Sequence, residues 1–585
     1  MLTLVSFLFF TALVAVIAYL KTRREDLSQV TGYFLAGRSL TWTVIAGSLF
    51  LTNISAEQLT GLNANAFSNG ANVMAWETMA ALALIALAFL FLPRYLRSGI
   101  STVPQFLENR FGKRMRVVAS LIFIYAIVIG FLPFVLYAGA ITLGQLFDIG
   151  GLLGIGQAAT TWLMVIAIGV TGGIYAVFGG LKAVAVSDSI NGIGLLIAGL
   201  LVPILGLYTL GDGDFTAGFH TLMTESPQRM SAVGLSDDAN IPWYGMISGV
   251  IIINLFYWCT NQAIVQRALG AKNLAESQKG VLAAGFLKIV GVFMLVLPGI
   301  IAYHLFQHGL LDIPSKPGSD ALNADTAYPV LVRAILPTWL TGFFCAAMFG
   351  AILSSFNSGV NSLSTLISLD LYKQLIRPDA SDRQTVAVGR LFAILTIVLC
   401  IVIAPFIASA DSLYTLMRTI MAVINVPIFT VVLFGVISRR APALAGYLGL
   451  AFGMAFFYVT HFVLGDDLGF VQVHWLVLVG INFILMHGVM SLVRYLKPQA
   501  TPFVLTYTRE VDVTPWRYAR HASWALVALL VLLYAALSPL GVTSPSGSAT
   551  AVIGVTLAAL VVLYGLYRLI VARYRRMAPL ATKSG

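Results

Sequence analysis

The sequence predicts an all-α polytopic membrane protein. Only 10% of its 585 residues are charged, whereas about 25% is usual for a soluble domain. A soluble chain of this length would expose more surface than so few charges keep in solution. Hydrophobic residues make up 59% of the chain and gather in runs of about 20, the length of a helix that crosses a bilayer. These observations exclude a soluble enzyme, a disordered chain and a fibrous repeat.

Fifteen apolar runs are long enough to form membrane-spanning helices, and Pro, Gly or charged residues separate them. They cover residues 2–20, 42–62, 72–93, 117–147, 159–178, 183–210, 243–264, 281–303, 339–369, 391–408, 413–437, 443–464, 471–493, 521–538 and 550–572. The first run has no basic residue before it, and Lys21, Arg23 and Arg24 follow it. This arrangement predicts a retained membrane anchor rather than a cleaved signal peptide.

Basic residues alternate between the two sides of this predicted bundle. If the N-terminus lies outside, the cytoplasmic segments carry 29 of the 35 Lys and Arg residues, and the outer segments carry only Arg229, Lys316 and Arg333. Cytoplasmic loops of membrane proteins carry the excess of Lys and Arg, so the C-terminus is predicted to be cytoplasmic. The same distribution accounts for the net charge of +11 without nucleic acid, because no basic patch with interleaved aromatic residues is present.

The charged residues inside apolar runs include Glu77, Asp188, Lys288 and Arg418. Charges in a membrane span are costly and usually face a cavity or a partner. A structural ion pair and an interfacial position are the alternative explanations. Glu77 and Lys288 lie well inside their runs, which favours a role in binding a solute or a coupling ion.

Two runs are interrupted by polar residues at matching positions, five runs apart. The interruptions fall at residues 51–61 and at residues 254–262. Paired interruptions in two corresponding halves indicate an inverted-repeat transporter with its site near the middle of the membrane. Polar contacts between helices are the alternative explanation for any single residue.

A third polar cluster, at residues 354–358, interrupts the ninth run with three serines and an asparagine. Hydroxyls and backbone carbonyls are hard oxygen ligands, which suit sodium, although serine-rich helix packing is the competing explanation. No phosphate-binding loop of the form G-x-x-x-x-G-K-[ST] is present, so ATP does not drive the protein directly. Nothing resembles a nucleophile elbow or a metalloprotease helix, and we therefore expect no enzyme.

Several stretches resemble the sodium:solute symporter family, specifically an uncharacterised bacterial subgroup of its sodium/glucose cotransporter branch. They are GYFLAGR at 32–38, NISAEQ at 53–58, FYWCTNQ at 256–262, VQR at 265–267 and the serine pair at 354–355. The resemblance implies a LeuT-like fold: a 5+5 inverted-repeat core with one extra N-terminal span and about four extra C-terminal spans. The expected divisions are 1–24 for the extra span, 40–212 and 240–440 for the repeats, and 441–585 for the C-terminal spans and tail.

The resemblance also implies which residues bind the solute and the ion. Sugar hydroxyls would be bound by Asn53, Gln58, Glu77, Asn254 and Lys288. The sugar ring would stack on Tyr257, the inner gate, with Trp258 beside it. A sodium ion would be bound by the carbonyls of Leu51, Ile54 and Ala351 and the hydroxyls of Ser354 and Ser355, with Asp188 on its exit route.

The sequence departs from the family pattern at two positions in these sites. A sugar-contacting glutamine of the family is replaced by Thr419, with Arg418 beside it, and a second sodium site would need a serine where this chain has Ala351. We therefore expect sodium-coupled import of a sugar or related polyol across the bacterial inner membrane, with one sodium ion. The alternative is sodium- or proton-coupled symport of an anionic solute such as a sugar acid, with Arg418 as its counter-charge.

The alternative function from a different class of protein is a transporter-like sensor or a channel. A sensor would carry a soluble output domain, and a channel would show repeated pore charges rather than one mixed pocket. The sialic-acid branch of the family is less expected, because run 117–147 offers no Arg or Lys to a carboxylate.

Overall fold

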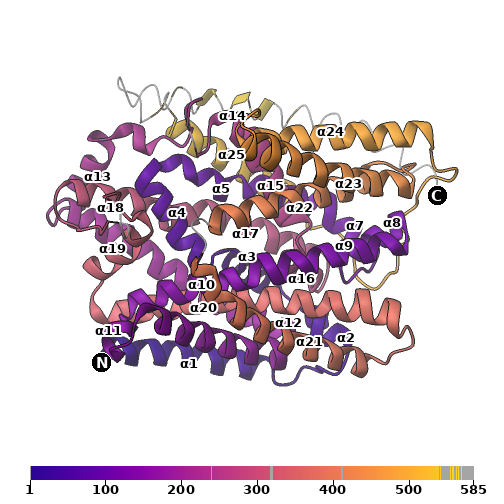
Figure 1. Cartoon of the computed structure of the whole chain (residues 1–585), viewed down its shortest axis with the longest axis horizontal. Helices are drawn as coiled ribbons and strands as arrows, with labels where there is room; N and C mark the ends of the chain where they lie inside the picture. Colours follow the sequence, from indigo (N-terminus) through magenta and orange to yellow (C-terminus); the bar gives the residue numbers. More distant parts are fainter. Residues whose placement is uncertain are drawn as a thin grey trace.

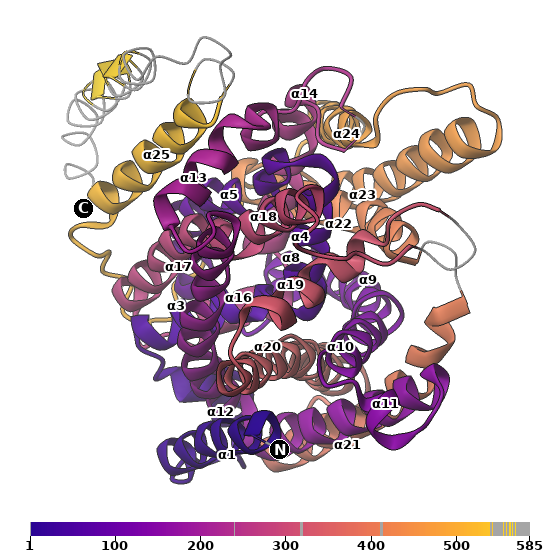
Figure 2. The ribbon, with the colours of Figure 1, turned by 90° about the vertical axis from the view of Figure 1, so that its left-hand side faces the viewer.

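The computed structural model describes residues 2–238, 240–315, 320–409 and 413–538, with scattered residues between 541 and 568; the side chains of 408–420 and 466–467 are not described. Within the described part, the chain is helical and its only β contacts are three isolated bridges. Long helices lie side by side and form one bundle (Figure 1). In the end-on view, α1 and α12 lie at one edge and α23, α24 and α25 at the opposite edge (Figure 2).

The first half of the described chain contains α1 (Leu2–Thr22), α2 (Val30–Leu35), α3 (Trp42–Asn53), α4 (Ala56–Asn69), α5 (Ala75–Thr78), α6 (Ala80–Ala86), η3 (Leu87–Phe91), α7 (Leu92–Arg97), α8 (Val103–Phe111), α9 (Lys113–Tyr125), η4 (Ala126–Phe131), α10 (Leu132–Leu146), α11 (Ile149–Leu153), α12 (Gln157–Leu210) and α13 (Phe215–Thr224). The second half contains α14 (Trp243–Gly245), η6 (Met246–Val250), α15 (Ile251–Cys259), α16 (Gln262–Leu269), α17 (Leu274–Leu295), α18 (Leu297–Gln307), α19 (Ala327–Ile335), α20 (Thr338–Thr365), η8 (Leu366–Ile376), α21 (Asp382–Ile403), α22 (Leu413–Ile437), α23 (Ala443–Tyr458), η10 (Val459–Asp467), α24 (Trp475–Leu496) and α25 (Ala519–Ala536).

The expected number of fifteen spans is not confirmed. Among the described residues, ten helices are long and apolar enough to cross a bilayer, or eleven if the pair 243–259 and 262–269, bent by 49°, counts as one span. One cause is α12, which counts as one helix although it consists of two helical segments that meet at Gly180, where φ is 61° and ψ is −174°. These segments correspond to the predicted runs 159–178 and 183–210. Another is run 42–62, which is divided between α3 and α4, of 12 and 14 residues. Most of the fifteenth run, 550–572, lies outside the described residues.

Both predicted interruptions are helix breaks in the structure. Ile54 and Ser55 have extended backbones between α3 and α4, and Thr260 and Asn261 separate α15 from α16. The Asn261 side chain caps the N-terminus of α16: its Oδ1 accepts a hydrogen bond from the backbone N–H of Ala263 at 2.9 Å. Because a helix end leaves backbone groups without helical partners, each break supplies polar backbone groups in the middle of the bundle.

The helix α20 lies at the centre of the packing around these breaks. It packs against α1, α3, α10 and α12, and α3 packs in turn against α12 and α17. Small residues allow the close approaches: a Cβ atom on Gly139 would lie 2.7 Å from the Ile352 side chain. Such small-residue contacts are the usual means of packing helices in membranes. The first break, between α3 and α4, is therefore fixed against a buried central helix.

The segment between α24 and α25, residues 497–518, crosses the face of the bundle where α1 ends. The backbone N–H groups of Phe503 and Thr508 donate to the carbonyls of Arg439 (2.7 Å) and Arg97 (3.1 Å). Glu510 forms an ion pair with Arg38, with Oε2 and Nη2 3.0 Å apart. The segment therefore brings together Arg38, Arg97 and Arg439 on one face of the molecule. The charge distribution predicts that all three lie on the cytoplasmic side.

Candidate functional site

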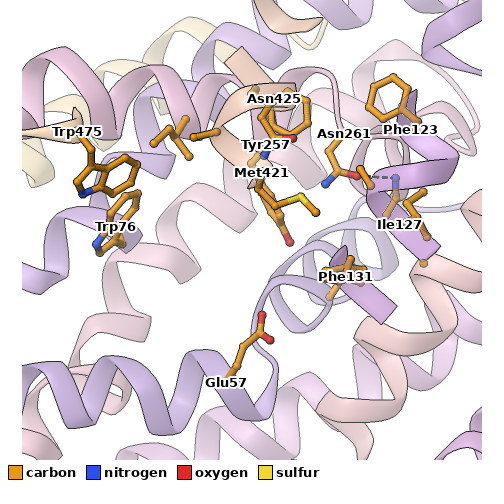
Figure 3. A pocket seen from close by; sticks show the side chains of 17 residues that line it. Glu57, Trp76, Phe123, Ile127, Phe131, Tyr257, Asn261, Met421, Asn425 and Trp475 are labelled. Carbon is orange, nitrogen blue, oxygen red and sulfur yellow. Dashed lines mark hydrogen bonds between the residues drawn. The ribbon is translucent and has the colours of Figure 1, made fainter. Parts of the chain in front are cut away.

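Two adjoining hollows lie between the broken spans. One has a volume of about 180 Å³ and the other of about 200 Å³. Both are lined by Thr52, Glu57, Trp76, Phe131, Ile253 and Tyr257. The smaller hollow adds the polar residues Asn53, Ser55, Gln58, Asn254 and Ser355. In Figure 3, which shows the larger one, Glu57 points into the open space from α4 and Tyr257 lies near its centre. Solute sites are typically such concave sites with a few polar groups.

Glu77 and Lys288 form a direct ion pair behind the smaller hollow. The two side chains are 1% and 0% exposed, and Lys288 also donates to Oδ1 of Asn53. Gln58 donates from Nε2 to Oε1 of Glu77 at 2.9 Å. A buried charge is tolerated when it is paired and hydrogen-bonded, and both conditions are met here.

The ion pair acts on the hollow through two amides. Among the described residues that line the smaller hollow are Asn53 and Gln58, and neither Glu77 nor Lys288. An amide carries both a donor and an acceptor. Lys288 binds Oδ1 of Asn53, and Glu77 binds Nε2 of Gln58, so the remaining polar group of each amide is held in one orientation. The structure thus places the predicted charged ligands one layer behind the predicted amide ligands.

The second broken span supplies three further predicted residues. Asn254 lines the smaller hollow and donates from Nδ2 to the carbonyl of Trp76 at 3.2 Å. Tyr257 lines both hollows. Trp258 does not line either of them among the described residues; it is buried, and its ring lies 5.8 Å from Nζ of Lys288. Trp258 therefore contacts the ion pair rather than the open space beside Tyr257.

Oxygen atoms of α20 face the break between α3 and α4. Ser355 Oγ donates to the carbonyl of Thr52 at 3.0 Å, and Ser354 Oγ lies 3.3 Å from Oγ1 of Thr52. The other three predicted sodium ligands, Leu51, Ile54 and Ala351, are buried at the same break or on α20. Carbonyl and hydroxyl oxygens are hard ligands, so this set fits a sodium ion as a transported substrate.

Asp188 lies beside this oxygen cluster and is paired with Arg267, which lies between the predicted runs 243–264 and 281–303. Its Oδ2 accepts from Ser48 at 2.7 Å and from Thr52 at 3.4 Å. It also forms an ion pair with Nη2 of Arg267 at 3.1 Å, and both side chains are 1% exposed. Arg267 in addition donates to the hydroxyl of Ser358. The Arg267 guanidinium therefore lies next to Asp188, the residue predicted to lie on the sodium exit route.

Sequence reasoning missed several residues at this site. Glu57 and Thr52 stood inside the recognised 51–61 interruption, so their polarity was the available signal. Trp76 and Trp475 stack with centroids 6.2 Å apart and line the larger hollow, but no local pattern separates them from other membrane aromatics. The side chains of Arg418 and Thr419 lie outside the described residues.

Two broken helices five spans apart, a polar hollow between them and an oxygen cluster beside it define an inverted-repeat secondary transporter of the membrane. The model of the family described as "SSF: Sodium:solute symporter family" matches residues 33–453. The chain belongs to the sodium:solute symporter family. It is accordingly a multi-pass symporter and not an enzyme.

Curated relatives agree with this membership. The chain is 43% identical to the uncharacterized symporter YidK of Escherichia coli (strain K12), over 92% of each chain. It is 32% identical to the sodium/glucose cotransporter of Vibrio parahaemolyticus, over 72% of this chain and 78% of the relative. It is also 32% identical to the human sodium/myo-inositol cotransporter, over 76% of this chain and 64% of the relative.

The fold matches that of a solved symporter. The structure of the substrate-bound outward-open state of a Na⁺-coupled sialic acid symporter superposes with a TM-score of 0.70 at 18% identity, over 86% of this chain and 99% of that chain. At this identity the likeness concerns the fold. The chain has the predicted LeuT-like fold with its inverted-repeat core, while the residue boundaries expected for the repeats stay predictions.

Proposed function

We propose that this symporter imports a neutral sugar or a related polyol together with sodium across the bacterial inner membrane. The observation that carries the proposal is the smaller hollow, where the amides of Asn53, Gln58 and Asn254 converge beside Tyr257. Hydroxyl groups both donate and accept, so amide side chains satisfy them, and a tyrosine offers an apolar face with a polar tip. The names of the sodium/glucose and sodium/myo-inositol relatives support the same solute class.

The charges around the hollows favour a neutral solute over an anionic one. Among the described lining residues of both hollows there is no Lys or Arg. The buried cations nearby already have anionic partners, because Lys288 is paired with Glu77 and Arg267 with Asp188. An anion placed here would lack the charged partner that a buried charge needs.

The test is a thermal-shift screen of the purified protein against hexoses, cyclitols, linear polyols and sugar acids, each with sodium and with choline in its place. We expect at least one neutral polyhydroxylated compound to raise the melting temperature, and to do so more strongly in sodium, because a ligand that binds the folded state stabilises it. Stabilisation by sugar acids alone would overturn the proposal and point to Arg418 as a counter-charge. Arg418→Ala would then abolish binding, whereas it should spare a neutral sugar.

The proposed sodium ligands predict a selective variant. Ser355→Ala removes a hydroxyl that donates to Thr52 across the break and leaves the amides of the solute hollow in place. Uptake should therefore require a roughly tenfold or higher sodium concentration, since losing one oxygen ligand weakens binding by about 1.4 kcal/mol or more. The measurement is the sodium activation curve of solute uptake. Ser364→Ala, the same change about two and a half turns further along α20, is the matched control. An unchanged sodium curve for Ser355→Ala would remove this hydroxyl from the sodium site.

The distribution of basic residues predicts the orientation of the proposed importer. With the N-terminus outside, the face crossed by residues 497–518 is cytoplasmic. Reporter fusions after residues 380 and 580 should give a cytoplasmic signal, and a fusion after residue 467 should give an outside signal. A periplasmic signal at 580 combined with the expected two others would show that run 550–572 does not cross the membrane.

A further inference from the structure

Four arginines gather on the face of the bundle that residues 497–518 cross. Arg94 and Arg97 belong to α7, and Arg439 and Arg440 form the corner between α22 and α23. Backbone hydrogen bonds from the crossing segment reach the carbonyls of Arg97, Arg439 and Arg440. Arg94 lies close enough to Arg439 for the two positive charges to repel each other. We call these four residues the arginine cluster.

The arginine cluster has no acidic partner. In the described part of the chain, none of its members forms an ion pair with a carboxylate. The two acids of the crossing segment are otherwise engaged, since Glu510 pairs with Arg38 and Asp512 accepts hydrogen bonds from its own turn. Residues 412–509 contain two further acids, and both lie in η10, at the opposite end of α23. Because like charges held together repel, the cluster calls for an anion from outside the chain.

The start of α23 adds to the positive potential at this corner. The helix begins at Ala443, its first turn contains no acidic residue, and no side chain caps its first backbone N–H groups. The N-terminal end of a helix carries a partial positive charge and accommodates anions. This helix end directly follows Arg439 and Arg440, so two sources of positive potential coincide.

Exposed apolar side chains flank the same corner. Ile437, at the end of α22, is 61% exposed, and Leu444, in the first turn of α23, is 42% exposed. The helix α23 lies at the edge of the bundle (Figure 2), so the corner faces the surrounding lipid. A soluble anion would leave these side chains uncovered, whereas the acyl chains of a lipid would cover them. The combination of cations and apolar side chains therefore matches a charged lipid.

We propose that the arginine cluster binds the phosphate group of an anionic phospholipid, whose acyl chains lie against Ile437 and Leu444. In the orientation predicted from the basic residues, this lipid belongs to the inner leaflet. A guanidinium pairs with phosphate oxygens through two parallel hydrogen bonds, and basic pockets between membrane helices on the cytoplasmic side bind such headgroups. The bound phosphate links α7 to the corner between α22 and α23, and this site is separate from the solute hollows.

The experiment follows thermal unfolding of the purified full-length protein in a neutral detergent during titration with phosphatidylglycerol. Phosphatidylglycerol should raise the melting temperature in a saturable way, because a ligand of the folded state stabilises it, and added salt should weaken the effect. Phosphatidylcholine with the same acyl chains should have little effect, and equal stabilisation by both lipids would overturn the proposal. Inorganic phosphate and glycerol 3-phosphate distinguish the two sources of phosphate. If either stabilises as strongly as phosphatidylglycerol, the site takes a soluble anion and the lipid is excluded.

Two double variants locate the site. Arg439→Gln with Arg440→Gln should need about 25-fold more phosphatidylglycerol for half-maximal stabilisation, since each arginine near a lipid surface strengthens binding about fivefold. Both side chains are exposed, and the corner bonds to the crossing segment through backbone carbonyls, so the variant should fold. If it does not fold, Arg97→Gln, also at an exposed position, should give a fivefold shift.

The matched control is Arg23→Gln with Arg24→Gln. It removes the same charge after the end of α1, on the same predicted side of the membrane but at the opposite edge of the bundle (Figure 2). This control should leave the phosphatidylglycerol titration unchanged. Equal weakening in both double variants would indicate a general effect of charge and would overturn the site. An unchanged titration in Arg439→Gln with Arg440→Gln would overturn it as well.

Discussion

Replacing Lys288 by Ala should lower the free energy of unfolding by about 3–5 kcal/mol, because it leaves Glu77 buried without its partner. Solute affinity should fall ten- to a hundredfold, equivalent to about 1.4–2.8 kcal/mol, because Asn53 and Gln58 lose the charges that orient them. The measurements are thermal unfolding in detergent and solute binding at saturating sodium. Glu77→Ala should have effects of similar size for the same reason.

Two further variants separate pairing from solute binding. Lys279→Ala makes the same change on α17, where Lys279 lies 2.8 Å from Glu276 and is 32% exposed; a surface pair is worth about 0–1 kcal/mol, so little should change. The double variant Glu77→Gln with Lys288→Met removes both charges together. It should recover most of the stability but not the affinity. Wild-type affinity in folded Lys288→Ala protein would exclude this ion pair from the solute site.

The breaks in α3–α4 and α15–α16 were predictable because two clusters of polar residues occur at matching positions of two apolar runs. Asn53 and Gln58 lie within three residues of the first break, and Asn254 lies on α15, which ends at the second break. All three belong to the polar interruptions that the local sequence shows. The number of spans was harder to predict. The two runs on either side of Gly180 follow each other without a loop, because the chain turns at this one residue, whose φ of 61° and ψ of −174° are not helical. Hydropathy alone does not show whether such adjoining runs form one span or two.

Contacts between distant segments were not predictable from local patterns. Arg267 stands in a basic stretch after an apolar run, which is typical of a cytoplasmic loop, yet Asp188, 79 positions earlier, draws it into the interior. Trp475 belongs to α24, outside the predicted repeats, and the packing of α24 against η6 brings it to Trp76. Phe123 and Ile127 line the larger hollow, but their stretch of the chain has the same composition as a helix face that contacts lipid.

The Arg267–Asp188 pair predicts the second large effect. The Arg267 guanidinium contacts Asp188, Ser48 and Ser358, and so acts as a built-in cation beside the oxygen cluster at Thr52 and Ser354. Arg267→Ala leaves the Asp188 carboxylate buried among hydroxyls, which should cost about 3–5 kcal/mol of stability in the absence of sodium. A sodium ion then becomes the available counter-charge.

Sodium should therefore rescue the Arg267→Ala variant. Its melting temperature should depend steeply on sodium, since a ligand at a hundred times its Kd stabilises by about 2.7 kcal/mol, and choline should have no such effect. Uptake should become slower at all sodium concentrations, because an ion held by an unpaired carboxylate on the proposed exit route leaves slowly. Arg267→Lys keeps a cation in place and serves as the control, with a sodium dependence close to that of the unmodified protein. If Arg267→Ala shows the same sodium dependence as Arg267→Lys, Asp188 does not meet the transported ion, and its pairing with Arg267 is purely structural.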